Sequence, residues 1–218
     1  MFDLITIGDA NLDTIVVLDE ASLSCDLKQE HCQLCLNYAD KVPIKQSEQS
    51  VGGNAANVSS GIAKLGLKVA IISELGNDVS GQTIQKKLKN DKVDTRFIKI
   101  IKKGETNYGV VLTYKGERTI LSYHAKRHYS LPKLLPTKWV YYTSLGQSFE
   151  NLQTKLMVYL KKNKTTKLAV NLGSFQLRDG LETAKQILPL TEILFANKEE
   201  AEIIEVNFHQ TYLTVVDD

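Results

Sequence analysis

Short runs of apolar residues alternate along the chain with longer segments in which apolar side chains recur every three or four positions. The runs are typical of strands covered on both faces, and the periodic segments are typical of amphipathic helices. The runs predict strands over residues 4–7, 14–18, 68–75, 96–101, 108–114, 118–123, 139–143, 168–170 and 193–195, with a weaker signal over 41–50. The periodic segments predict helices over 54–65, 80–90, 149–162, 181–188 and 198–204. Strands that alternate with helices from residue 52 onward indicate an α/β fold with a central, mostly parallel sheet flanked by helices.

Local signals support two of these elements. The helix over 54–65 places four apolar side chains on one face, and Gly66 follows as a C-terminal stop. These four are Ala55, Val58, Ile62 and Leu65. The turn Lys115-Gly116-Glu117 between two β-rich runs predicts a hairpin. Because no repeat or low-complexity linker divides the chain, we expect one domain over 1–218, with a small β lid or insertion within about residues 14–50.

Composition narrows the class of protein. Of 218 residues, 43% are hydrophobic and 24% are charged, which excludes a disordered or collagen-like chain. The formal net charge is +2 without a long single-sign run, so we expect no nucleic-acid partner. No apolar stretch approaches the roughly 20 residues that cross a bilayer, and no basic segment followed by an apolar one opens the chain. We therefore expect a cytoplasmic protein without a membrane partner.

The segment Gly52-Gly53-Asn54-Ala55-Ala56-Asn57-Val58-Ser59 stands at the start of a predicted helix. Two glycines let a ligand or another backbone come close, and the free N–H groups of a helix start favour acceptors and negative charge. Asn57 can present its amide on the same side. A plain tight turn with a helix cap explains the spacing equally well.

This segment, followed by Gly66 and Gly76, resembles the N-terminal signature of the ribokinase-like, or PfkB-type, carbohydrate and nucleoside kinases. Four further segments are similar to that family, so the resemblance spans nearly the whole chain and is weakest over 19–49. These are Gly8-Asp9-Ala10-Asn11-Leu12-Asp13, Gly76-Asn77-Asp78-Val79-Ser80-Gly81, Gly116-Glu117-Arg118-Thr119 and Asn197-Lys198-Glu199-Glu200. The resemblance implies a ribokinase-like fold and transfer of the ATP γ-phosphoryl group to a hydroxyl of a sugar, sugar acid or nucleoside.

The resemblance also implies a substrate site. Asp13 would accept hydrogen bonds from vicinal hydroxyls, and the backbone at Gly52 and Gly53 and the amide of Asn57 would contact the same ligand. On its own, Asp13 would be interpreted as a turn carboxylate. We expect it beyond the first strand's carboxyl end, in the region where open α/β sheets bind ligands.

A second motif points to nucleotide and metal. Asn197 and Glu200 resemble the family's Asn-x-x-Glu pair, which organises Mg²⁺ and the phosphates, and Glu200 would act directly or through water. Asn171, which follows a predicted strand, is expected near the nucleotide. Without the other motifs, a helix cap with acids in the first turn would explain the same residues.

Members of the family carry a further segment resembling Gly-Ala-Gly-Asp, whose Asp is the catalytic base and whose backbone N–H groups form an anion hole. The 218 residues contain no such segment, so we expect this chain to be C-terminally incomplete and inactive alone. The alternative is a non-catalytic sugar-sensing or interaction module that keeps the substrate half. Lids in this family often serve as dimer contacts, which suggests a homodimer through the lid.

Cysteines and histidines offer weaker candidates. Cys25, Cys32 and Cys35 beside His31 have enough ligands for a zinc site, but the paired knuckles are missing, so we favour reduced thiols in a variable insertion. The segment 124–128, with two histidines, Lys126 and Arg127, is interpreted as a solvated turn rather than a phosphate site.

Overall fold

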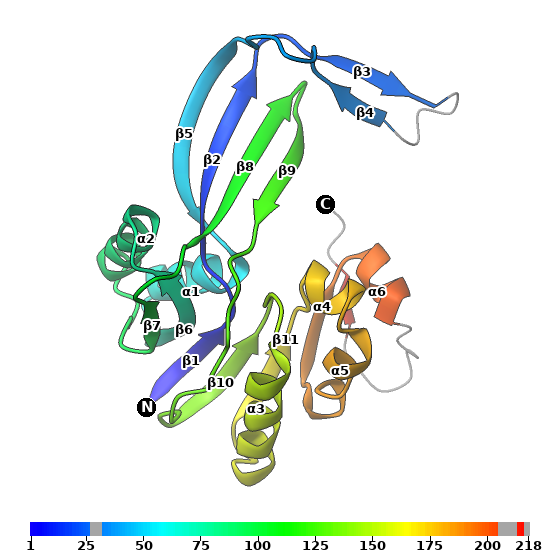
Figure 1. The fold of residues 1–218 in the computed structure, drawn as a ribbon. Helices are drawn as coiled ribbons and strands as arrows, with labels where there is room; N and C mark the ends of the chain where they lie inside the picture. The colour runs from blue at the N-terminus through cyan, green and yellow to red at the C-terminus, as the bar shows by residue number, and fades with distance from the viewer. Residues whose placement is uncertain (27–31, 205–212, 216–218) are drawn as a thin grey trace.

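The computed structural model describes residues 1–26, 32–204 and 213–215 (Figure 1). Its main sheet has seven strands in the order β13-β12-β11-β10-β1-β6-β7, and every pair is parallel. The strands are β1 (Phe2–Ile7), β6 (Val69–Gly76), β7 (Ile98–Ile101), β10 (Thr137–Tyr142), β11 (Lys167–Val170), β12 (Ile193–Ala196) and β13 (Leu213–Val215). The predicted parallel α/β architecture is confirmed.

The strand order changes direction at β1. From β1 the chain goes to β6 and β7 on one side, and later crosses to β10, β11 and β12 on the other. Ile5 pairs with Ala70 of β6 on one side and with Val140 of β10 on the other. The loops after β1 and β10 therefore diverge from neighbouring strand ends, which in open α/β sheets creates a crevice for ligands.

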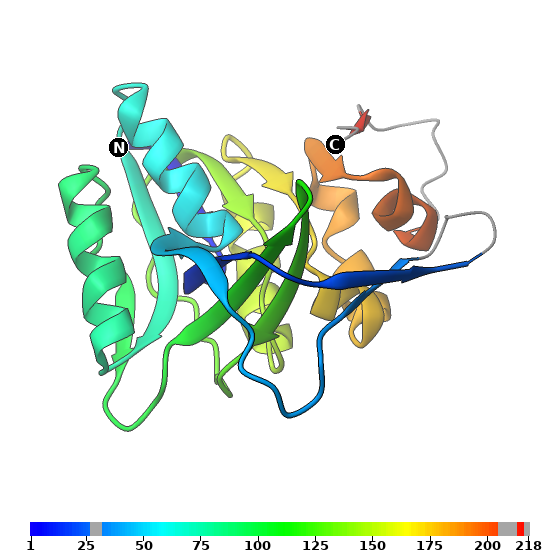
Figure 2. The same ribbon diagram turned by 90° about the horizontal axis from the view of Figure 1, so that it is seen from above.

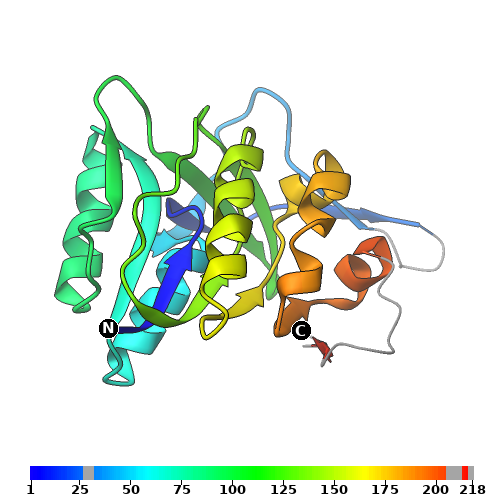
Figure 3. The ribbon, with the colours of Figure 1, turned by 90° about the horizontal axis from the view of Figure 1, so that it is seen from below.

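Helices cover both faces of this sheet (Figures 2 and 3). One face packs against α1 (Asn54–Lys64) and α2 (Val79–Asn90). The other packs against α3 (Glu150–Lys162), α4 (Ser174–Arg178), α5 (Leu181–Lys185) and α6 (Lys198–Ile204). All eight residues of β6 are buried, as its continuous apolar run predicts. None of the described helices has the length and hydropathy that crossing a bilayer requires.

A second sheet rises from the carboxyl ends of the main strands and forms the lid (Figure 1). It has the order β5-β2-β8-β9, built from β2 (Asn11–Leu18), β5 (Ile44–Gly52), β8 (Asn107–Tyr114) and β9 (Glu117–Tyr123). The β8–β9 hairpin turns through Lys115 and Gly116, whose φ angles of 51° and 90° are left-handed. The lid thus combines strands from two distant parts of the sequence.

An arm extends from the lid as a separate two-stranded sheet of β3 (Ser22–Cys25) and β4 (Cys32–Cys35). The expectation of reduced thiols is wrong for two cysteines, because Cys25 and Cys32 form a disulfide. The antiparallel register of the arm places them directly opposite each other. Cys35 is a free cysteine, and His31 lies outside the described residues.

Three local expectations need correction. Leu65 is 75% exposed, because α1 ends at Lys64 and its buried residues are Ala55, Ala56 and Ser59. The single helix predicted over 181–188 is α5 followed by a 3₁₀ turn, Leu188–Leu190, that contains a proline. Arg127 is not solvated: it is 3% exposed, and its Nη2 donates to the carbonyl oxygen of Glu105 at 2.6 Å.

Candidate functional site

Asp13 lies beyond the carboxyl end of β1, and it belongs to the lid strand β2 rather than to a loop. Its carboxyl group sits over two glycines of the neighbouring strands, Gly52 of β5 and Gly109 of β8. A Cβ atom at Gly52 would lie 2.0 Å from Asp13 Oδ2, and one at Gly109 would lie 2.2 Å from Oδ1. Glycine on both sides therefore leaves the space that the carboxyl group fills.

Asp13 is half-buried at the base of the lid, and burial raises the pKa of its carboxyl group. The amide of Asn11 donates a hydrogen bond to Oδ1, which acts in the opposite direction and favours the ionised form. Asn11 and Asp13 lie two residues apart on one strand, so their side chains share a face. Together they present donors and acceptors on the face where the lid meets the main sheet.

Gly53 connects the lid to α1 in a backbone conformation that requires glycine. Its φ angle is 89°, and a Cβ atom there would lie 2.5 Å from the carbonyl oxygen of Asp9. The turn brings the start of α1 against the loop after β1. Asn57, in the first turns of α1, is exposed, and its backbone N–H donates to Gly53 at 3.0 Å.

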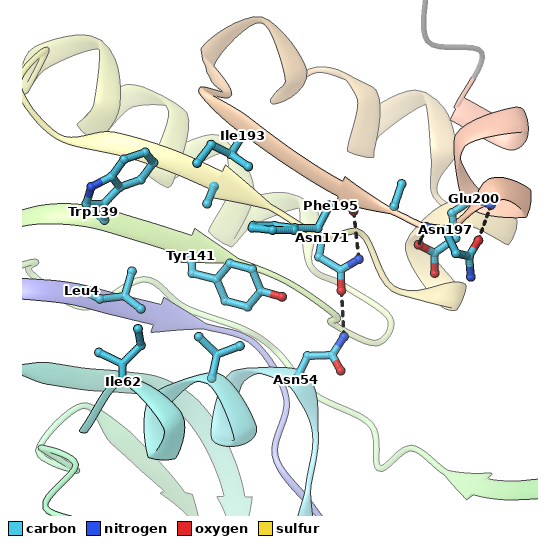
Figure 4. Close-up of a pocket in the computed structure, with 13 residues that line it drawn as sticks. Leu4, Asn54, Ile62, Trp139, Tyr141, Asn171, Ile193, Phe195, Asn197 and Glu200 are labelled. Atoms are coloured by element: carbon cyan, nitrogen blue, oxygen red, sulfur yellow. Dashed lines mark hydrogen bonds between the residues drawn. The ribbon is translucent and has the colours of Figure 1, made fainter. Parts of the chain in front are cut away.

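Asn54, the first residue of α1, begins a chain of amide hydrogen bonds along the carboxyl edge of the sheet (Figure 4). Its Nδ2 donates to Asn171 Oδ1 at 2.9 Å and to Ser144 Oγ at 3.1 Å. Asn171 Nδ2 in turn donates to the carbonyl oxygen of Phe195 at 3.0 Å. The ends of β10, β11 and β12 are thereby joined to the helix that follows Gly53.

Asn197 and Glu200 bond to each other at the start of α6 (Figure 4). Glu200 N donates to Asn197 Oδ1 at 2.8 Å, and Asn197 N donates to Glu200 Oε2 at 3.1 Å. This reciprocal pattern is a capping box, which satisfies helix N–H groups that have no partner within the helix. It also fixes the direction of the Glu200 carboxylate, which faces a pocket.

This pocket has a volume of about 620 Å³ and contains an apolar wall and a polar end (Figure 4). Trp139, Tyr141 and Phe195 contribute aromatic rings, and Tyr141 and Phe195 pack edge to face with centroids 6.2 Å apart. The polar end consists of Asn54, Asn171, Asn197 and Glu200. Such a combination suits a ligand with a flat apolar part and a polar part.

The sequence-predicted residues thus form two groups. Asn171, Asn197 and Glu200 line one pocket, whereas Asp13, Gly52 and Gly53 meet at the base of the lid. The peptide bond between Gly53 and Asn54 connects the two groups. The side chain of Asn57 is in neither set of contacts.

Three residues that sequence reasoning did not select take part. Asn11 and Asn54 stand inside the quoted motifs, where their residue type was a usable signal. Gly109 had no local signal, because its role depends on β8 pairing with β2, which lies almost 100 residues earlier in the sequence.

The fit to Mg²⁺ rests on a single carboxylate. Within the part of the chain that the structure describes, no group of three or more His, Cys, Asp or Glu side chains could hold a metal ion. Mg²⁺ commonly keeps several waters and binds one or two carboxylates together with substrate phosphates. Glu200 fits that partial role.

Comparison with known proteins decides the family. The pfkB family carbohydrate kinase profile matches residues 12–211. The chain belongs to this family. The match includes both groups of candidate site residues, so the resemblance inferred from the motifs is confirmed.

Two bacterial kinases are similar in sequence to this chain. The ribokinase of Haemophilus influenzae is 26% identical over 163 residues, which are 70% of this chain and 50% of that protein. The aminoimidazole riboside kinase of Salmonella typhimurium is 32% identical over 116 residues, 49% of this chain and 36% of that protein. The chain therefore spans half or less of the length of these curated relatives.

Solved structures confirm the ribokinase-like fold. Arabidopsis thaliana ribokinase, complexed with ribose and ATP, has a TM-score of 0.70 at 17% identity. That alignment covers 93% of this chain and 62% of the plant enzyme.

Proposed function

We propose that these residues form the acceptor-binding part of a pfkB-type kinase that phosphorylates a hydroxyl of a sugar, sugar acid or nucleoside. The carboxyl group of Asp13 in its glycine cradle carries the proposal. An ionised carboxylate accepts two strong hydrogen bonds, which suits two neighbouring hydroxyl groups. Asn11 keeps that carboxylate in place, and the backbone at Gly52 and Gly53 lies close enough to contact the same ligand.

We assign the nucleotide side of the reaction to the pocket beyond Asn54. Its aromatic wall fits a flat base, and its polar end fits ribose and phosphate groups. Glu200 would hold Mg²⁺ through water, with phosphate oxygens as the remaining ligands. When bound, the metal would neutralise charge on the phosphates. The ATP bound in the structure of the plant ribokinase and the Asn197–Glu200 pair support this assignment.

Phosphoryl transfer also needs a base for the acceptor hydroxyl and donors for the transferred group. We propose that neither comes from these 218 residues, because their sequence has no segment like Gly-Ala-Gly-Asp. General-base assistance is worth about 10²–10⁴-fold and each oxyanion donor about 10²–10³-fold. The chain alone would then bind an acceptor without detectable turnover.

The acceptor site can be tested by thermal unfolding with D-ribose, aminoimidazole riboside, adenosine and D-gluconate. Binding only to the folded state at about 100 times Kd stabilises by about 2.7 kcal/mol, or roughly 5–10 °C for a chain of this size. We expect at least one acceptor to raise Tm, and Asp13→Ala to remove that shift while Tm without ligand stays within about 2 °C.

Glu48→Ala is the matched control, because it removes an exposed carboxylate from the same lid sheet. It should keep the ligand-induced shift. If Asp13→Ala lowers Tm strongly without ligand, Asp13 is a structural residue. If no acceptor raises Tm of the wild type, the proposed site is wrong.

Two broader assignments belong to the same proposal. A second copy would cover the exposed apolar side chains of the lid, which include Ile120 and Leu121 of β9, and would form a homodimer. An enzyme that draws on ATP and small metabolites would work in the cytoplasm.

A further inference from the structure

Asp9 is a buried carboxylate with no part in the chemistry proposed above. It is 5% exposed and lies two residues after the end of β1 at Ile7. The hydroxyl of Tyr129 lies 2.8 Å from each of its carboxylate oxygens, and Gly146 N donates to Oδ2 at 3.2 Å. Gly146 N also donates to the Tyr129 oxygen at 3.0 Å, which closes a three-membered cluster.

The three residues of this cluster lie in three different segments that connect strands. Asp9 lies where the chain leaves β1 and enters the lid strand β2. Tyr129 lies where the chain has left the lid strand β9 and returns toward β10. Gly146 belongs to the loop after β10, and the carbonyl oxygen of Ser144 in the same loop accepts from Asp9 N at 2.8 Å. The cluster therefore links three segments: the one that enters the lid between β1 and β2, the one that leaves it between β9 and β10, and the loop after β10 at the edge of the main sheet.

The charged surroundings of Asp9 come mainly from the segment after β9. Burial is the largest influence and raises the pKa of Asp9 to about 6. The Tyr129 hydrogen bond, the charges of His124 and Arg127, and the bond from Gly146 all act in the opposite direction. Burial and the Asp9 charge raise the pKa of Tyr129 well above its ordinary value, so its hydroxyl keeps its proton.

We infer that Asp9 is a positioning residue for the acceptor site, and that its cluster with Tyr129 and Gly146 holds the base of the lid in place. Asp13 lies four residues further along the same segment, and a Cβ atom at Gly53 would touch the carbonyl oxygen of Asp9. Release of the cluster would let the cradle of Asp13 move relative to α1. The role in acceptor binding rests on the proposed function, whereas the fastening of the lid does not.

The stability of the closed lid base depends on pH and decreases as pH rises. When the base of the lid opens, Asp9 meets water and its pKa returns toward the ordinary value near 3.8. Asp9 binds its proton more tightly when the lid is closed, so protonation of Asp9 stabilises the closed lid relative to the open lid. This stabilisation is complete below pH 4 and is lost as pH rises through about 6. Between pH 5 and pH 7, linkage predicts that opening becomes about tenfold more frequent.

Amide hydrogen exchange followed by mass spectrometry tests this inference without any ligand. The lid is read from peptides covering residues 8–18 and 107–123, and the core from a peptide covering β6. Tyr129→Phe removes the hydroxyl and should speed exchange of the lid peptides about tenfold, with β6 unchanged. After correction for intrinsic exchange chemistry, the wild-type lid should open about tenfold more often at pH 7 than at pH 5. Asp9→Asn should abolish that difference.

Tyr142→Phe is the control, because Tyr142 is also buried and hydrogen-bonded, to Gln153 of α3 and Gln176 of α4. It should leave lid exchange as in the wild type. The inference is overturned if Tyr129→Phe leaves lid exchange unchanged or speeds β6 equally, or if the pH difference persists in Asp9→Asn, which would assign that difference to another group. Should Asp9→Asn not fold, Tyr129→Phe alone decides. Because no sugar or nucleotide is added, the result is independent of whether the proposed acceptor binds.

Discussion

The carboxyl group of Asp13 occupies space that a side chain on either neighbouring strand would fill. Gly52 and Gly109 are therefore part of the acceptor site, although neither brings a functional group of its own. Gly61 of α1 provides a contrast, because a Cβ atom there would meet nothing within 4 Å. Replacement of glycine by alanine should have opposite effects at these two kinds of position.

We expect Gly109→Ala to displace the Asp13 carboxyl group, to weaken acceptor binding at least about tenfold and to lower the free energy of unfolding by about 1–3 kcal/mol. Gly61→Ala, as its control, should raise the free energy of unfolding by about 0.5–1 kcal/mol, because alanine favours a helix interior. Urea unfolding and calorimetric titration of both variants give the two quantities. Normal binding by Gly109→Ala would show that the cradle does not constrain Asp13.

Sequence reasoning located the site residues that stand in continuous motifs. Asp13, Gly52, Asn197 and Glu200 are recognisable because their neighbours in the chain repeat a family pattern. Gly109 was not recognisable, because it acts on a residue that only the parallel β2–β8 pairing brings near. The burial of Arg127 was not predicted for the same reason. Its partner is the carbonyl oxygen of Glu105, which precedes the β8–β9 hairpin, whereas Arg127 follows it.

At the scale of elements, the start of α2 joins the main sheet to the lid. Asp78 caps α2 by accepting from Gly81 N at 2.8 Å, and it also accepts from Thr106 N at 2.7 Å and Thr106 Oγ1 at 2.6 Å. Thr106 directly precedes β8, so the cap of the helix also anchors a lid strand. Burial raises the pKa of Asp78, but these hydrogen bonds outweigh it and lower the pKa below its usual range.

Asp78→Ala should lower the free energy of unfolding by about 1–3 kcal/mol, because it removes the cap and leaves Thr106 donors without a partner. Since the folded-state pKa is depressed, the contribution of Asp78 is present above about pH 4 and is lost as pH falls further. The difference between wild type and Asp78→Ala should therefore shrink in acid. Asp78→Asn retains an acceptor and should lose less. Urea unfolding of the three proteins at pH 3 and pH 7 measures this, and an equal difference at both values would contradict the assignment.

The sequence predicted elements best where one physical rule decides the conformation. Strands of the main sheet are buried on both faces, so their apolar runs mark them clearly. The arm strands β3 and β4 are mostly exposed and carry no such run, so the pattern missed them and the disulfide between them. The five-residue helix α4 is too short for a periodic pattern.

At the scale of the whole molecule, the pocket beside α1 has an apolar wall on the main sheet. Its walls include Leu4, Trp139 and Ile193, which lie on the sheet face shared with α1. Parallel sheets are normally covered on both faces. Since the solved plant ribokinase is matched over only 62% of its length, we propose that additional polypeptide of the pfkB fold covers this wall and brings the base and the phosphate donors.

Transfer of labelled phosphate from [γ-³²P]ATP to the acceptor panel, measured with the purified 218-residue chain and Mg²⁺, tests this account most directly. We expect no labelled product from the chain alone, and labelled product once a segment carrying Gly-Ala-Gly-Asp is fused after Asp218. Glu200→Gln in the fused protein should reduce transfer by at least about tenfold, as loss of a charge-assisted contact predicts. Clear transfer by the unfused chain, surviving repurification and abolished by Glu200→Gln, would contradict the account, because these residues would then contain the base themselves.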